Sequence, residues 1–253
     1  MKNKIYVITH KDFKYNILDT YQPIFVGNKK PTENMKYIFD SSGDNIANKN
    51  ENYCELTAIY WIWKNIHNCD NVGIVHYRRY FVYGFRSKLV GDKFIEKNLG
   101  KKHYDIVLPY KFKTKHNVYR HFIDSPSGKD KDLINLRKII AKKYPEYLES
   151  YDYVMSSRKA SYCNMMITSK KIYDDYCAWL FDILFDLEKI TDLTGYTQQQ
   201  KRIYGFLSEF LLNVYVAKNN LRVKYCSMYF IENSKFKNFL KKVKLGFRSL
   251  FLR

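Results

Sequence analysis

Short apolar runs alternate with longer helix-compatible stretches over the first 110 residues, and this alternation limits the folds the chain can adopt. Residues 4–9, 71–76 and 105–108 are rich in β-branched and other apolar side chains, as expected of buried strands. Strands that alternate with helices are typical of a parallel sheet covered by helices. We therefore expect an α/β fold with a mostly parallel central sheet flanked by helices.

The second half of the chain is richer in helical patterns. Residues 116–160 are compatible with helices, and residues 163–168 form a fourth apolar run. Two further stretches, 172–187 and 203–215, repeat apolar residues at the spacing of an amphipathic helix. Because no internal repeat or linker divides the chain, we expect one domain over residues 1–234, with a helical C-terminal part.

Residues 235–253 differ from the rest of the chain because they contain seven Lys or Arg and no acidic residue. Their apolar side chains fall on one face of a helix, and most of the cations fall off that face. A basic amphipathic helix of this kind is typical of proteins that bind an anionic membrane surface. The alternative is a last helix that packs on the core and exposes a basic rim.

Composition excludes several classes of protein. Aromatic residues make up 17% and apolar residues 46%, which excludes a disordered chain. The five cysteines form no CxxC pair, so neither a disulfide framework nor a zinc site is indicated. No apolar stretch reaches the roughly 18 residues that span a membrane, and the N-terminal apolar run is too short for a signal peptide. We expect a cytoplasmic protein, peripheral on the inner face of the cell membrane.

The chain carries 44 Lys and Arg against 25 Asp and Glu, a net charge of +19, which favours nucleic acid or small phosphorylated substrates as ligands. The run at 71–76 leads into His76, Tyr77, Arg78 and Arg79. Ligands of open α/β sheets bind beyond the carboxyl ends of strands, where two guanidinium groups are able to neutralise a diphosphate. Strand alternation puts His76 and Arg78 on one side and Arg79 on the other, which favours Arg78. An ordinary basic loop would contain the same residues.

Several longer motifs occur in the order that one bacterial family shows. They are Asp44-Asn45, NYCELTAIYWIWKN at 52–65, GIVHYRRYF at 73–81, KYPEYL at 143–148, NMMI at 164–167, WLFDIL at 179–184 and GFLSEFLLN at 205–213. With these motifs the chain resembles, over about residues 3–232, the glycosyltransferases of capsular and exopolysaccharide gene clusters, a family long classified as a domain of unknown function.

The resemblance implies a nucleotide-sugar-dependent transferase with a GT-A-like fold that builds surface polysaccharide. Transfer of a galactose-type sugar, pyranose or furanose, from a UDP-sugar is favoured. The partners would be this donor, a lipid-linked saccharide acceptor and, through residues 235–253, an anionic membrane, while nucleic acid is not expected. Two alternatives stay open: a nucleic-acid-binding protein, which the charge would allow, and a non-catalytic scaffold of the polysaccharide assembly complex.

Enzymes with the GT-A fold usually stabilise the leaving diphosphate with a divalent metal on an Asp-x-Asp that follows a buried strand. Here the comparable strand end carries His76, Arg78 and Arg79 instead. The Asp-x-Asp at 130–132 precedes an expected helix and is interpreted as its cap. We therefore expect fixed cations to do the electrostatic work of the metal. Binding of Mn or Mg through a single Asp from elsewhere stays open.

Glu209 is the candidate base that takes the proton from the acceptor hydroxyl. It interrupts an apolar helix pattern and shares a polar stripe with Arg202, Gly205 and Asn213. A solvated or ion-paired glutamate would fit the same position. Because one base stands out, we expect an inverting reaction.

Glu55 is the rival candidate. Together with Asn52 it fits a capping box at the start of a helix over residues 52–67, which would explain it structurally.

The donor is expected to lie against the end of the first strand, where a nucleotide enters a GT-A-type sheet. Asp40 and Asp44 lie in a loop suited to the hydroxyl groups of the ribose or sugar. Asn164 resembles an asparagine that lines the donor or acceptor pocket in several GT-A families, although an asparagine bonded to a strand edge would look the same. Trp61 and Trp63 are expected in the core. The expected donor-binding residues are Thr9, His10, Lys11, Asp44, Asn45, Tyr53, Tyr77 and Asn164.

Overall fold

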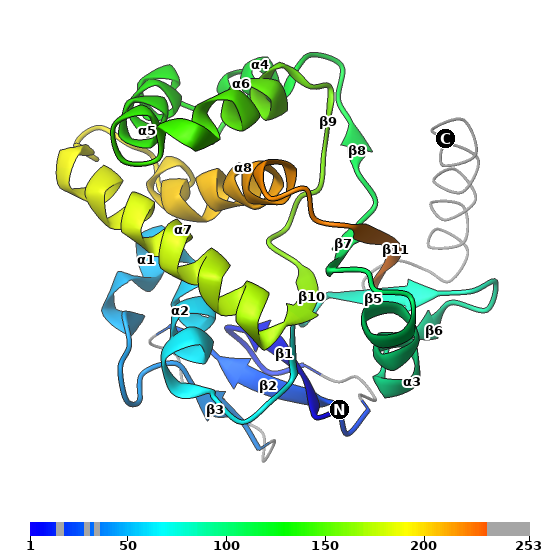
Figure 1. Cartoon of the computed structure of the whole chain (residues 1–253). Helices are drawn as coiled ribbons and strands as arrows, with labels where there is room; N and C mark the ends of the chain where they lie inside the picture. The colour runs from blue at the N-terminus through cyan, green and yellow to red at the C-terminus, as the bar shows by residue number, and fades with distance from the viewer. Residues whose placement is uncertain (14–17, 28–30, 33–35, 232–253) are drawn as a thin grey trace.

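The structure of the protein, a computed structural model, describes residues 1–13, 18–27, 31–32 and 36–231. Its centre is a nine-stranded sheet with the strand order β3-β2-β1-β4-β10-β7-β11-β5-β6 (Figure 1). A two-stranded ribbon of β8 and β9 lies outside this sheet. The strands are β1 (Asn3–Thr9), β2 (Tyr21–Phe25), β3 (Ile38–Phe39), β4 (Asn71–His76), β5 (Arg79–Tyr83), β6 (Lys88–Leu89), β7 (Ile106–Pro109), β8 (Phe112–Lys113), β9 (Lys159–Ala160), β10 (Met166–Ser169) and β11 (Val223–Phe230).

The sheet is mixed, and the expectation of a mostly parallel sheet is wrong. Strands β3, β2, β1 and β4 run parallel to one another, and β7 pairs in parallel with β11. In contrast, β10 runs antiparallel to both β4 and β7, and β5 runs antiparallel to β4, β11 and β6. The apolar runs did not predict these directions, because a strand buried on both faces has the same pattern whichever way it points.

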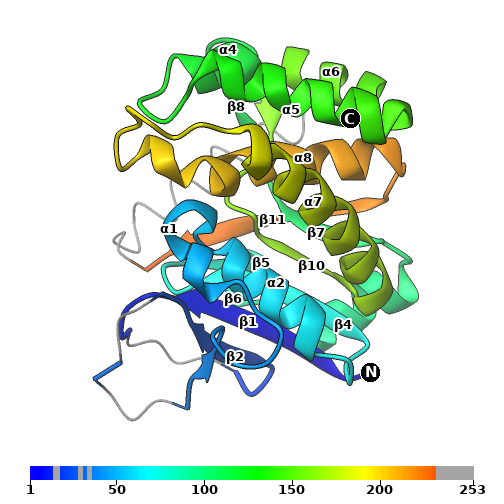
Figure 2. The same cartoon turned by 90° about the vertical axis from the view of Figure 1, so that its left-hand side faces the viewer.

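Most of the helices gather on one side of the sheet. α2 and α7 lie against it with α8 beside α7, and α4, α5 and α6 form an outer layer over α7 and α8 (Figure 2). α3 lies apart from them, beside the β5–β6 hairpin (Figure 1). The helices are α1 (Asn50–Tyr53), α2 (Leu56–Asn65), α3 (Asp92–Ile95), α4 (Val118–Ile123), α5 (Asp130–Lys143), α6 (Leu148–Ser156), α7 (Lys170–Ile190) and α8 (Ile203–Lys218), with the short 3₁₀ helices η1 (Ala47–Lys49), η3 (Pro145–Tyr147) and η4 (Gln200–Arg202) and the π-helix η2 (Glu96–Lys101).

Both faces of the central strands are buried in apolar cores. Along β1, Tyr6 belongs to the larger core that includes α2, α7 and α8, while the next residue, Val7, belongs to the smaller core. Trp61 is buried in the larger core and Trp63 packs against it, as expected. The two amphipathic patterns in the second half of the chain form α7 and α8, so those predictions are confirmed.

The helix expected over residues 52–67 is broken at Cys54. α1 ends one residue before it, Cys54 adopts a left-handed φ of 52°, and α2 begins two residues later. Asn52 lies inside α1, and its side chain donates a hydrogen bond to the carbonyl of Lys201. The expected capping box with Glu55 is therefore wrong, and Glu55 precedes α2 without a side-chain bond to its first turn.

The Asp-x-Asp at 130–132 lies in the first turn of α5, and neither carboxylate caps the helix. Asp130 accepts a hydrogen bond from the hydroxyl of Tyr119, and Asp132 accepts one of 2.7 Å from Tyr196. The interpretation of this motif as a cap is thus wrong, and both side chains instead tie α5 to neighbouring segments.

In the described part of the chain, we find no helix that is both long and apolar enough to cross a bilayer. The basic segment at 235–253 lies outside the described residues, so its amphipathic helix stays a prediction.

Gly73 in β4 occupies a position where a side chain would displace the core. A Cβ atom there would lie 2.8 Å from Cγ1 of Ile5 and 3.1 Å from Cγ1 of Ile167. We expect Gly73→Ala to lower the free energy of unfolding by about 1–3 kcal/mol, because both neighbours are β-branched and buried. At Gly91 the added Cβ would instead meet the end of the flexible Leu18 side chain, so Gly91→Ala is the control. Equal destabilisation of both variants in urea unfolding would contradict this packing.

Candidate functional site

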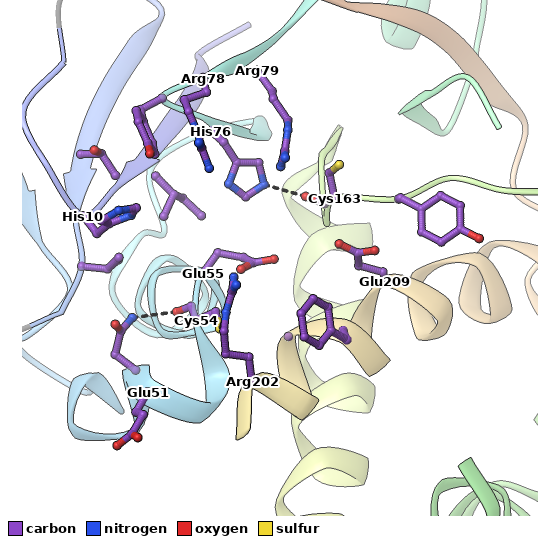
Figure 3. A pocket seen from close by; sticks show the side chains of 18 residues that line it. His10, Glu51, Cys54, Glu55, His76, Arg78, Arg79, Cys163, Arg202 and Glu209 are labelled. Atoms are coloured by element: carbon purple, nitrogen blue, oxygen red, sulfur yellow. Dashed lines mark hydrogen bonds between the residues drawn. The ribbon is translucent and has the colours of Figure 1, made fainter. Parts of the chain in front are cut away.

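β1 and β4 pair in parallel with Ile8 opposite His76, so both strands end at the same edge of the sheet. A cavity of about 640 Å³ lies beyond this edge, a volume typical of small-molecule sites. It is lined by the ends of β1 and β4, the α1–α2 junction, the loop before β10 and the first half of α8 (Figure 3). The loop before β10 reaches this edge because β10 runs antiparallel to β4.

Both arginines at the end of β4 line the cavity. His76 pairs with Arg79 across a hairpin whose two turn residues are Tyr77 and Arg78. The expectation that Arg78 and Arg79 point to opposite sides is therefore wrong, because the chain reverses direction directly after His76. Their guanidinium groups lie on either side of the His76 imidazole (Figure 3).

The ring of Tyr77 is buried, and two cationic side chains and an imidazole ring pack against it. The guanidinium of Arg78 lies 5.1 Å from its centroid, the ammonium of Lys11 lies 5.3 Å away, and His10 meets it edge-on at 5.4 Å. Thr9, His10 and Tyr77 line the cavity, whereas Lys11 does not line it and lies beside the Tyr77 ring. The hydroxyl of Thr9 donates to the carbonyl of Lys11, which holds the turn that follows β1.

The Nε2 atom of His76 lies 2.6 Å from the carbonyl oxygen of Cys163. A carbonyl oxygen only accepts, so Nε2 carries a proton and Nδ1 is the acceptor of this imidazole. Burial lowers the pKa of His76; the charge of Glu55 raises it, Arg79 and Arg78 lower it again, and the net shift is downward. His76 is therefore neutral at pH 7 and ties the loop before β10 to the end of β4.

Glu209 projects from α8 into the cavity (Figure 3). Its pKa is raised to about 8, first by burial and then by the negative charge of Glu55. A backbone hydrogen bond from Cys163 and the charges of Arg79 and Arg202 act in the opposite direction without cancelling the shift. Near neutral pH this carboxylate therefore holds a proton far more readily than an ordinary glutamate.

Glu55 also lines the cavity, a place that the interpretation as a helix cap missed. Its Oε1 accepts a hydrogen bond of 2.8 Å from Nδ2 of Asn164. The same amide group donates to Oγ of Ser208 at 2.8 Å and to the carbonyl of Gly205 at 3.0 Å. Asn164 thereby links the α1–α2 junction to α8, and the carboxylates of Glu55 and Glu209 face each other (Figure 3).

Arg202 also lines the cavity, although its sequence pattern indicated only a place in the polar stripe of α8. Its Nε donates to Sγ of Cys54 at 3.2 Å, and its guanidinium lies 5.3 Å from the ring centroid of Phe206. A Cβ atom at Gly205 would lie 3.3 Å from Cβ of Cys54. Glycine therefore permits α8 to approach the α1–α2 junction, and this approach brings Arg202 near both carboxylates.

Four further residues expected at the donor do not line the cavity. Tyr53 is fully buried, and its hydroxyl donates to Glu188 at 3.1 Å. Asp44 and Asn45 lie in an exposed loop, where their side chains hydrogen-bond to the loop and to α2. Asn164 is buried behind the carboxylate that it holds. Tyr53 and Asn164 therefore support the walls of the site, whereas Asp44 and Asn45 lie outside it.

The described residues include no group of three or more His, Cys, Asp and Glu side chains placed to hold a metal ion. Within the cavity, Glu55 and Glu209 offer the oxygen atoms that Mn or Mg prefers, while Nε2 of His76 is engaged by Cys163. Two carboxylates alone do not make a closed metal site, so the mechanism proposed below assigns no step to a metal.

A family model described as "Domain of unknown function (DUF4422)" matches residues 4–220. The chain belongs to this family. It is also similar to the WbbM bifunctional glycosyltransferase, solved as an apo structure, with 30% identity and a TM-score of 0.83 over 92% of the chain. The chain spans 46% of the WbbM chain, somewhat less than half of its length. The expected membership of a family classified as a domain of unknown function, with a likeness to a glycosyltransferase, is thereby confirmed, while the link to capsular and exopolysaccharide gene clusters stays a prediction.

A more distant structural likeness is to Core-mannan synthase A (CmsA/Ktr4) from Aspergillus fumigatus in its Mn/GDP form. It covers 83% of this chain and 66% of that one, with 12% identity and a TM-score of 0.40, too low to carry an argument about the site. No curated protein matches the chain.

We expect Glu209→Gln to raise the melting temperature at pH 8 and to leave it nearly unchanged at pH 4. Because the pKa of Glu209 rises from 4.5 to about 8 in the folded protein, ionisation of this side chain destabilises the fold. This penalty is absent below about pH 4.5, grows as the pH rises and is complete above about pH 8. Thermal unfolding across this range measures it, with Glu51→Gln at the exposed rim of the cavity as the control. A gain at pH 8 no larger than that of the control would contradict the burial of Glu209.

Proposed function

We propose that the protein is an inverting glycosyltransferase that uses a nucleoside-diphosphate sugar. The observation that carries this proposal is a single cavity that holds both arginines of the β4–β5 hairpin and a carboxylate, Glu209, whose pKa is about 8. The likeness to WbbM, described as a bifunctional glycosyltransferase, supports the same class of reaction. Because this chain spans less than half of WbbM, the proposal rests first on the chemistry of its own cavity.

Arg78 and Arg79 are proposed to bind the diphosphate of the donor. When the bond between the anomeric carbon and the diphosphate oxygen breaks, negative charge grows on the departing diphosphate. Guanidinium groups fixed by the β4–β5 hairpin stabilise that charge without having to reorganise. The neutral His76 adds no charge of its own, and it positions the loop before β10 beside the reacting groups. Thr9 and His10 at the end of β1 would lie along the nucleoside.

Glu209 is proposed to act as the general base. The acceptor hydroxyl oxygen attacks the anomeric carbon on the face opposite the diphosphate, its proton passes to a carboxylate oxygen of Glu209, and the diphosphate leaves with the electron pair. A base with a pKa of about 8 accepts a proton much better than an ordinary glutamate. Glu55 contributes by keeping this pKa high through its negative charge.

The finer details of the proposed activity rest on the motif resemblance. They are a UDP-linked donor, a galactose-type sugar in pyranose or furanose form, and a lipid-linked oligosaccharide acceptor in the synthesis of capsular or other surface polysaccharide. We propose that the protein works at the inner face of the cell membrane and that residues 235–253 bind its anionic surface.

The two alternative functions have less support. A nucleic-acid-binding protein would use its aromatic side chains at a surface, yet six of the largest fully buried side chains are tyrosines. A scaffold without activity would have no need for a carboxylate held at a raised pKa beside two arginines.

We expect UDP and UDP-galactose to raise the melting temperature of the wild-type protein at physiological salt. Arg78→Gln and Arg79→Gln together should weaken UDP binding by about 100-fold, because each substitution removes a charge-assisted contact to the diphosphate. Arg86→Gln is the control, since Arg86 is exposed and does not line the cavity. Stabilisation by oligonucleotides alone, with a steep dependence on salt, would overturn the proposal.

Glu209→Gln should lower kcat by about 100- to 10,000-fold and leave UDP affinity unchanged, because it removes a proton acceptor without removing a donor contact. In the wild-type protein, kcat/KM should rise with pH and level off above about pH 8, since only ionised Glu209 accepts a proton.

Glu55→Gln should move this inflection to lower pH, because it removes the negative charge that helps to raise the pKa of Glu209. Glu51→Gln, at the exposed rim of the same cavity, should leave the inflection in place. Near-wild-type turnover of Glu209→Gln would show that another group is the base.

A further inference from the structure

A second cavity, of about 700 Å³, lies farther along β5, on the side of α3. It is bordered by the end of β5, by α3 and η2, and by β11, and it shares no described lining residue with the first cavity. Among the described residues that line it there is no aspartate or glutamate, but there are four lysines: Lys93, Lys97, Lys102 and Lys224.

The continuous helical segment formed by α3 and η2 places three of these lysines, Lys93, Lys97 and Lys102, on one face. Lys93 and Lys97 are four residues apart, which is one turn of an α-helix. Beyond Lys97 the chain takes a five-residue step, because the amide of Lys102 donates to the carbonyl of Lys97 at 3.1 Å. Lys102 therefore lies one turn after Lys97, whereas an α-helix would turn it away from that face. Helical turns of this kind are rare and occur frequently at functional sites.

Aromatic rings form much of the remaining wall. Tyr83 and Phe94 pack with their centroids 4.8 Å apart, and Tyr110 and Tyr225 stack at 6.1 Å. Burial raises the pKa of Tyr225 to about 12, so its hydroxyl stays protonated and adds no negative charge to the wall. The cavity therefore offers a ligand both cationic groups and flat apolar surfaces.

None of the four lysines forms an ion pair with a carboxylate of the described residues. Like charges gathered in one place repel one another, and a bound anion would relieve this repulsion. Lysine binds phosphate groups as a point charge, without the planar geometry that arginine requires. We propose that this cavity binds the phosphate or diphosphate group of a ligand other than the sugar donor.

The aromatic wall suits an organic portion attached to that group. A lipid headgroup and a soluble organic phosphate share this chemistry. Because the two cavities have no described lining residue in common, the inference does not depend on the proposed glycosyltransferase activity.

The test is calorimetric titration of the full chain with inorganic pyrophosphate, in a background that carries Arg78→Gln and Arg79→Gln so that the first cavity, also proposed to bind a diphosphate, does not contribute. Lys97→Gln and Lys102→Gln together should weaken binding by about ten-fold or more, because both charges border the cavity. Lys88→Gln and Lys101→Gln together form the control, since they remove the same net charge from exposed positions nearby that do not line it. The variant with Arg78→Gln and Arg79→Gln should still bind pyrophosphate, which separates this site from the first cavity.

Two further probes distinguish the sources of the phosphate. Geranyl diphosphate in solution and sedimentation with phosphatidylcholine vesicles, with or without phosphatidylglycerol, are compared for the same two pairs of variants. Lysine-dependent binding of geranyl diphosphate indicates a soluble ligand, and lysine-dependent binding to the anionic vesicles alone indicates a lipid headgroup. Lys97→Arg with Lys102→Arg should restore binding in either case, which excludes misfolding as the cause of the loss.

Equal weakening of pyrophosphate binding in the cavity pair and in the control pair would overturn the proposal, because binding would then follow net charge alone. Loss of all pyrophosphate binding in the Arg78 and Arg79 variant would do the same. So would lysine-dependent binding of an RNA oligonucleotide that pyrophosphate fails to displace, since the cavity would then serve nucleic acid.

Discussion

Strand β4 runs so close to its neighbours that Gly73 has no room for a Cβ atom between Ile5 and Ile167. This close packing fixes the parallel register with β1 on one side and the antiparallel register with β10 on the other. The two registers bring the end of β1, the end of β4 and the loop before β10 to one edge of the sheet. His76 then joins two of these segments through its hydrogen bond to Cys163. The candidate site is thus positioned by strand pairing, and the loops only complete it.

The electrostatics of the site follow from placing carboxylates where water is largely excluded. The negative charge of Glu55 makes ionisation of the buried Glu209 less favourable, and Arg79 and Arg202 compensate only in part. Such an arrangement lowers the stability of the fold, since protonation or removal of Glu209 would relieve it. Proteins commonly retain unfavourable groups of this kind where they perform chemistry. The destabilising carboxylate and the catalytic base are therefore the same side chain in our proposal.

Local patterns in the sequence predicted the central strands, α7, α8 and the cations at the end of β4. They failed where tertiary contacts decide the outcome. The two-residue turn after His76 and the left-handed Cys54 contain no glycine, so nothing in the residue types marked a reversal or a break. Glu55 was assigned to a capping box for the same reason, because a continuous helix would have used it there. Its place in the cavity depends on Asn164, which is distant in the sequence and close only in the fold.

A net charge of +19 says little about any one cation, but the fold separates the cations by their surroundings. On the outer helices they are paired, as in the contacts of Lys143 with Asp182 and Asp186 at 2.7 and 2.6 Å.

In the first cavity, arginines lie close to the carboxylates of Glu55 and Glu209, a combination that is able to bind an anion and accept a proton at the same place. In the second, lysines meet aromatic rings and no described carboxylate, a combination that binds an anion but has no carboxylate base. Strand β5 connects the two, with Arg79 at its start in the first cavity and Tyr83 at its end in the second. One short, hydrogen-bonded strand thus places side chains in two cavities of different chemistry, one that is able to bind an anion and accept a proton and one that is able only to bind an anion.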